Sequence, residues 1–69
     1  MEIAAELDGL LWKVVAHDGQ PVEEDETIMI IESMKMEIPV TTPMSGTLTR
    51  ILVREGDVVR EGQVLAIVE

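Results

Sequence analysis

The sequence predicts an all-β fold, a sandwich or barrel of short strands, and three observations support this prediction. Segments rich in valine, isoleucine, threonine and leucine recur along the chain. Clusters of glycine, proline and acidic residues interrupt the chain about every six to ten residues, so no helical periodicity is sustained. The chain also resembles itself at a fixed spacing, which indicates two equivalent β units.

The predicted strands occupy residues 10–16 and 27–31, then residues 47–53 and 63–68. Turn clusters separate them at residues 18–21, 23–26, 55–57 and 60–62. The apolar positions common to the two units are three residues apart, from Leu11 to Val14 and from Leu48 to Ile51. Strict alternation would place them two apart, so we expect a β-bulge or strong twist near residues 12–13 and 49–50.

A shift of 37 residues superimposes residues 9–32 on residues 46–69 without a gap. Of the 24 resulting pairs, seven are identical: Gly9/Gly46, Leu11/Leu48, Gly19/Gly56, Val22/Val59, Glu24/Glu61, Ile30/Ile67 and Glu32/Glu69. We therefore expect residues 1–69 to form a single domain with two related halves. The same shift carries residue 35 to a position just beyond Glu69, and the reverse shift carries residue 36 to a position just before Met1. We therefore expect the two chain ends to lie together, at the opposite end of the domain from residue 35. One departure is Asp25, which replaces Gly62 and predicts a different turn backbone in the first half.

A β-hairpin is predicted around residues 32–37, because apolar residues 28–31 and 38–40 flank this short polar segment. A two-residue turn at Met34-Lys35 would pair Ser33 with Met36 and Glu32 with Glu37. It would also require a positive φ at both turn residues, which hairpins usually assign to Asn-Gly or Gly-Gly. Departures from favourable local chemistry tend to occur at functional sites.

The motif Glu32-Ser33-Met34-Lys35-Met36-Glu37 resembles the attachment motif of biotinyl and lipoyl domains. In the biotinyl domains, the lysine between two methionines carries biotin on its side-chain amine. The resemblance extends over essentially the whole chain, whose length is similar to that of small stand-alone biotin/lipoyl attachment proteins. It implies a flattened β-barrel (a barrel-sandwich hybrid) of two antiparallel four-stranded sheets with quasi-two-fold symmetry, and a modified Lys35 at a hairpin tip.

The function that the resemblance implies is that of a carrier, not an enzyme. A biotin protein ligase would attach biotin to Lys35, and the domain would shuttle carboxyl groups between a biotin carboxylase and a carboxyltransferase. Lysine amines in water are protonated near neutral pH, whereas acylation needs the free amine. The ligase must therefore remove the proton, which makes the domain a substrate with no catalytic residue of its own.

Two alternatives to a biotin carrier stay open at this point. Lipoate could occupy Lys35, alone or in addition to biotin, for acyl transfer in a 2-oxo-acid dehydrogenase. Lipoyl domains usually have Asp-Lys at the tip, so Met34-Lys35-Met36 favours biotin. The second alternative is an unmodified barrel-sandwich module that serves only in protein–protein contact, to which loss of Lys35 would make no difference.

Four residues beside Lys35 are candidates for recognition by the ligase or the carboxylase. Met34 and Met36 offer flexible thioethers that suit a partner surface, although methionines often pack in a core. Glu32 and Glu37 would repel one another if directly opposed. A basic partner surface would relieve this repulsion, and so would simple solvation.

Composition disfavours several other classes of function. Five basic and fourteen acidic residues give a net charge of −9, which repels nucleic acids and anionic membranes. No apolar run approaches the roughly 18 residues of a membrane span. There is no cysteine and one histidine, His17, so we expect neither disulfides nor a zinc site.

The remaining expectations are less specific. The cysteine-free chain suits the reducing cytoplasm, and we expect a monomer. The acidic residues 23–26 lack the alternating ligands of a calcium loop and indicate a solvated turn. Trp12 corresponds to Thr49 and His17 to Arg54, so both should be at least partly exposed. Trp12 could cover a barrel edge or contact a partner.

Overall fold

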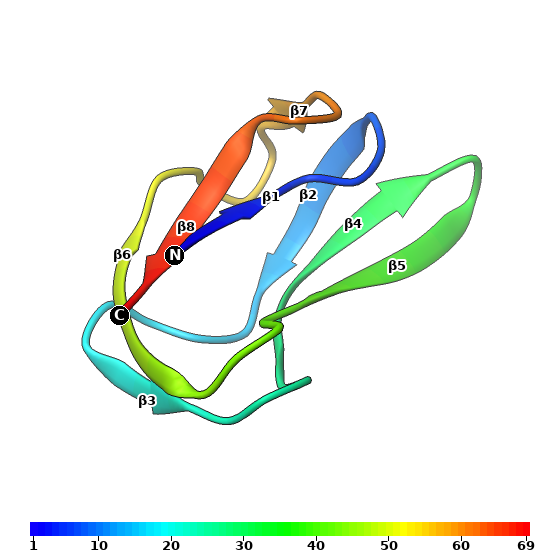
Figure 1. Cartoon of the computed structure of the whole chain (residues 1–69). Helices are drawn as coiled ribbons and strands as arrows, with labels where there is room; N and C mark the ends of the chain where they lie inside the picture. The colour runs from blue at the N-terminus through cyan, green and yellow to red at the C-terminus, as the bar shows by residue number, and fades with distance from the viewer.

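The computed structural model describes residues 1–69 as eight β-strands with no helix. The strands are β1 (Glu2–Ala4), β2 (Gly9–Val14), β3 (Gln20–Val22), β4 (Thr27–Ser33), β5 (Met36–Thr41), β6 (Gly46–Ile51), β7 (Val58–Val59) and β8 (Val64–Val68). They form two four-stranded sheets, β1-β8-β6-β3 and β5-β4-β2-β7, which face one another (Figure 1). Every pairing is antiparallel. The predicted fold class is confirmed.

A shift of 37 residues relates the pairing of one sheet to that of the other. Leu11 pairs with Ile31 in the first half, and Leu48 pairs with Val68 in the second. The strand β5 corresponds to β1, which reaches its sheet from the other end of the chain. In the second half, the N-terminal strand β1 therefore occupies the place beside β8 that β5 occupies beside β4.

The two chain ends lie together, away from the β4–β5 turn (Figure 1). Glu2 pairs with Ile67, and the amino group of Met1 donates a hydrogen bond of 2.6 Å to the carbonyl of Val68. This is the arrangement expected from the repeat, and it leaves the β4–β5 turn unobstructed by either end.

Both expected irregularities in the strands are present. The pairing of β2 with β4 shifts between Leu11 and Lys13, which leaves Trp12 without a partner. In the second half the shift lies between Leu48 and Arg50, around Thr49. The extra residue lets positions three apart face the same side, which explains the apolar spacing in the sequence.

The core lies between the two sheets. Its largest fully buried side chains come from β2, β4, β6, β7 and β8 and from the residue that follows β5: Leu11, Ile28, Met29, Ile31, Leu48, Leu65, Val59, Val68 and Thr42. Turn carboxylates join the two halves of the chain outside this core. The amide of Ile51 donates to Asp18 Oδ1 at 2.9 Å, and the amide of Val14 donates to Glu55 Oε2 at 2.9 Å.

The expectation of a different turn backbone at Asp25 is wrong. Asp25 has φ 68° and its counterpart Gly62 has φ 86°, so both adopt the left-handed conformation. The reason is an equivalent pair of tertiary hydrogen bonds, from the Asp25 amide to the Thr42 carbonyl (2.7 Å) and from the Gly62 amide to the Ala5 carbonyl (2.8 Å). Aspartate is among the residues that tolerate this conformation.

Gly9 and Gly46 provide a test of how closely the strands approach. A Cβ on Gly9 would lie 2.7 Å from the Glu32 carbonyl oxygen, and one on Gly46 would lie 2.5 Å from the Glu69 carbonyl oxygen. Because backbone atoms cannot rotate away, we expect Gly9→Ala and Gly46→Ala each to lower the free energy of unfolding by about 1–3 kcal/mol in urea titrations. Ser45→Ala, at an exposed neighbour, is the control. A Gly9→Ala variant as stable as this control would contradict the prediction.

Candidate functional site

The most distinctive feature of the molecule is the turn between β4 and β5. Ser33 pairs with Met36 and Glu32 with Glu37, so Met34 and Lys35 alone form the turn. Their φ angles are 52° and 65°. Two positive values are the requirement of a type I′ turn, which matches the twist of the flanking strands. The predicted register and the predicted backbone conformation are both confirmed.

Lys35 is exposed at this turn, and its amine has no partner in the chain. It takes part in none of the side-chain hydrogen bonds. The one ion pair of the molecule joins Arg60 to Asp8 at 3.9 Å. The other lysine differs, since the Lys13 ammonium lies 5.6 Å from the centroid of the Trp12 ring. Of the two lysines, Lys35 is therefore the one whose ammonium has no hydrogen bond, ion pair or cation–π contact within the chain.

The two methionines beside Lys35 lie on the surface. Met34 is 91% exposed and Met36 is 63% exposed, whereas Met29 is fully buried in the core. Packing in the core is therefore excluded as the role of Met34 and Met36. Their flexible thioether side chains border the lysine on both sides, where a partner can contact them.

Glu32 and Glu37 lie directly opposite one another and are both exposed. Directly opposed side chains on an antiparallel pair share one face, with Cβ atoms about 4.5–5.5 Å apart. Neither carboxylate forms an ion pair. The hairpin thus places two uncompensated negative charges on its outer face, three and two residues from Lys35.

The base of the hairpin is held by close packing between β2 and β4 at Gly9, a role that the sequence analysis did not assign to this glycine. Strand β4 pairs with β5 on one side and β2 on the other, and Ile31 is fully buried. Gly9 lies under this base, because a Cβ there would also come within 2.5 Å of the Ile31 Cγ2 and 3.3 Å of the Ser33 Cβ. The identity of Gly9 and Gly46 in the repeat was the signal that could have identified this role.

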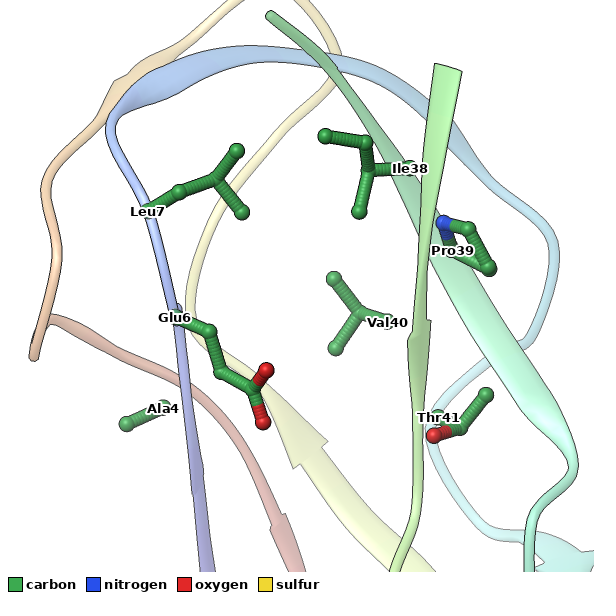
Figure 2. Close-up of a pocket in the computed structure, with 7 residues that line it drawn as sticks. All are labelled: Ala4, Glu6, Leu7, Ile38, Pro39, Val40 and Thr41. Carbon is green, nitrogen blue, oxygen red and sulfur yellow. The ribbon is translucent and has the colours of Figure 1, made fainter. Parts of the chain in front are cut away.

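The pockets of the molecule lie elsewhere. One is lined by Ala4, Glu6, Leu7, Ile38, Pro39, Val40 and Thr41, with the Glu6 carboxylate directed into the space beside β5 (Figure 2). Its volume is about 80 Å³ and that of the second is about 210 Å³. Small-molecule sites typically enclose about 300–1,000 Å³. Neither pocket includes a residue of the turn.

Other candidate features of the sequence are at the surface. His17 is exposed and Trp12 is 40% exposed, as their positions in the repeat predicted. No three His, Cys, Asp or Glu side chains are arranged as a metal-binding group. None of the secondary structure is a helix of the length and apolarity needed to cross a membrane.

Comparison with known proteins gives a consistent result. The family model for the biotin/lipoyl domain, described as "Biotin-requiring enzyme", matches residues 1–68. The biotin/lipoyl attachment protein of Bacillus subtilis is 42% identical over 65 residues, which is 94% of this chain and 89% of that protein.

Two solved structures show the same architecture. Urea carboxylase of Kluyveromyces lactis contains a region that matches with a TM-score of 0.95 and 36% identity, covering 100% of this chain and 6% of the carboxylase. The lipoyl domain of the 2-oxoglutarate dehydrogenase complex of Azotobacter vinelandii matches with a TM-score of 0.76 and 31% identity, over 90% of this chain and 78% of that domain.

The turn conformation can be tested by substitution at Met34. We expect Met34→Asn to raise the free energy of unfolding by up to about 1 kcal/mol, because asparagine tolerates the left-handed conformation better than methionine. Met34→Val should lower it, since a β-branched residue is poorly accommodated at positive φ. Met34 is 91% exposed, so lost packing does not obscure either effect. Urea titrations provide the measurement.

Met36→Asn is the matched control, because Met36 is exposed but lies within β5. Asparagine is disfavoured in strands, so this variant should show no gain in stability. Equal stabilities for Met34→Asn and Met34→Val would show that the backbone at residue 34 is not held in the left-handed region.

Proposed function

The chain belongs to the biotin/lipoyl attachment family, and on this premise we propose that it is a carrier that holds biotin in amide linkage on Lys35. The observation that carries the proposal is the position of Lys35 between Met34 and Met36 in an exposed two-residue turn. The amine has no hydrogen-bond or ion-pair partner to displace before it reacts.

The attachment step needs an enzyme. The Lys35 nitrogen attacks the activated carboxyl carbon of biotin, so that an amide C–N bond forms and the bond to the activating group breaks. The ammonium must first lose a proton, because only the free amine has the required lone pair. No side chain of this chain hydrogen-bonds the amine, so a biotin protein ligase must supply the base and align the reactants.

The hairpin that bears Lys35 suits a biotin group attached to its tip. Biotin, when bound, carries a carboxyl group between a biotin carboxylase and a carboxyltransferase. The chain's own contribution is a fixed root for the arm, since the turn is held by β4 and β5 and both chain ends lie away from it. A flexible arm on a rigid root keeps its end at high effective concentration at both active sites.

Two comparisons bear on the choice between biotin and lipoate. The region of urea carboxylase resembles this chain more closely than the lipoyl domain does, with TM-scores of 0.95 and 0.76. The Met34-Lys35-Met36 tip is also of the biotin type. These observations favour biotin, and lipoate, alone or on a dual acceptor, is the second candidate because the Bacillus subtilis relative is a biotin/lipoyl attachment protein.

The flanking residues Met34, Met36, Glu32 and Glu37 are, in this proposal, contacts for the ligase and the carboxylase components. Exposure of the two methionines and the lack of an ion pair at either carboxylate support this assignment. All four surround the root of the arm, so any enzyme that acts on Lys35 comes close to them.

Lys35→Arg should abolish attachment and leave folding unchanged. Arginine keeps the charge and the exposed position, but its guanidinium group is not acylated by the ligase. The chain would be purified from its own host and examined by intact mass and avidin binding. Lys13→Arg is the matched control and should retain full modification. The modification mapped to Lys13, or a wild-type chain of unmodified mass, would refute the proposal, and a lipoyl mass would select the second candidate.

Met34→Leu with Met36→Leu tests the role of the methionines. Leucine has a similar volume, so folding should change by less than about 1.5 kcal/mol. We expect attachment to survive and carboxyl transfer to slow severalfold, because leucine lacks the adaptable thioether. Steady-state rates with the carboxylase components provide the measurement. Wild-type rates in both ligation and transfer would show that partners do not distinguish the two side chains.

A further inference from the structure

Three exposed apolar side chains form a patch on the outer face of the sheet that bears Lys35. Leu10 is 37% exposed, Trp12 is 40% exposed and Val58 is 67% exposed; together they are named the β2–β7 patch. Leu10 pairs directly with Val58 on one side and with Glu32 on the other.

The pairing places this patch in line with the acidic pair of the hairpin. Directly paired residues share a face, and Glu37, Glu32, Leu10 and Val58 are paired in succession across the four strands. One row on the outer face therefore begins with two carboxylates and continues into exposed apolar side chains. Trp12, whose ring centroid lies 5.6 Å from the Lys13 ammonium, is two residues beyond Leu10 in β2.

The other sheet shows that the fold does not need this patch. A shift of 37 residues carries Leu10 to Thr47 and Trp12 to Thr49, and carries Val58 back to Pro21. Thr49 occupies the bulge equivalent to that of Trp12, where its hydroxyl donates to the Ile67 carbonyl at 3.2 Å. A polar residue thus occupies the equivalent bulge, so the fold does not require Leu10 and Trp12 to be apolar. Grouped exposed apolar side chains that folding does not require indicate an interaction site.

The charge beside the patch identifies the chemistry of the partner. Glu32 and Glu37 have no ion-pair partner, and the whole chain has a net charge of −9. A complementary surface has apolar side chains opposite Leu10 and Trp12, with arginine or lysine opposite the two carboxylates. Such complementarity accelerates encounter and orients the partner.

The short reach of an unmodified lysine side chain indicates which enzyme this partner is. The lysine amine is on a stem of four carbons, so an active site that encloses the bare amine must approach the turn itself. Glu32 is three residues from Lys35, so their backbones are at most about 10 Å apart, since even an extended strand rises only roughly 3.3 Å per residue. An enzyme that acts on the end of a loaded arm can contact the turn without covering β2, whereas the loading enzyme must come close to this part of the sheet.

We propose that the β2–β7 patch, with Glu32 and Glu37, is the docking surface for the ligase that loads Lys35. This inference rests on the proposed carrier function. The ligase binds with an apolar surface flanked by basic side chains and so aligns its active site with the turn.

The test uses Leu10→Thr with Trp12→Thr, which introduces the residues already present at Thr47 and Thr49. The full-length unmodified chain is titrated against a biotin protein ligase with biotin and ATP. We expect KM for the chain to rise at least tenfold with kcat changed less than twofold, because docking is lost and the reacting groups are intact. Thermal unfolding of the variant verifies the fold.

Val15→Thr with Leu52→Thr is the matched control, since these side chains are 52% and 45% exposed and lie outside the row. Their KM should stay within twofold of wild type. A wild-type KM for Leu10→Thr with Trp12→Thr would overturn the docking surface and leave the carrier function standing. Failure of the wild-type chain to accept biotin would instead refute the carrier function, and the docking proposal with it.

Binding can also be observed without turnover. Trp12 is the only tryptophan, so a chain labelled with 5-fluorotryptophan has a single fluorine resonance. Excess unlabelled ligase should shift or broaden this resonance, and Glu32→Gln with Glu37→Gln should weaken the effect at low salt. A resonance unmoved at ligase concentrations that saturate turnover would show that loading proceeds without contact at this face.

Discussion

The register between β4 and its two neighbours is the constraint on which the rest of the structure depends. In this register Ile31 and Met29 are fully buried, and Glu32 and Glu37 face solvent. A slip of one residue would exchange the two faces and bury carboxylates in the core, at a cost of several kcal/mol for each unpaired charge. The same register leaves two residues for the turn, so Lys35 must project from the tip.

The quasi-two-fold frame separates stability from function. Both sheets use equivalent bulges, turn hydrogen bonds and buried positions. The sheets differ at their ends and on their outer faces. One ends in the turn with Lys35 and exposes Leu10, Trp12 and Val58, whereas the other ends in the paired chain termini and has threonine or proline at those positions.

The turn combines a rigid base with a strained, accessible tip. Non-glycine residues at positive φ are retained only where the surroundings hold them in place. Here Gly9 allows β2 to pack closely under the hairpin, and the paired strands maintain the turn. In the proposed carrier function, this arrangement holds the root of the arm on paired strands, and the Lys35 amine is free of internal contacts.

The sequence by itself determined the strands, the two bulges, the hairpin register and the position of Lys35, because each depends on the spacing of residues near one another in the chain. The repeat also determined that the termini lie together. Only the tertiary structure decided that Asp25 adopts the conformation of Gly62, through its bond to Thr42. It likewise decided that Gly9 supports the hairpin and that Leu10 and Val58 continue the row of Glu32 and Glu37. These relations join segments far apart in sequence, and the order of strands in a sheet sets them, which no local pattern encodes.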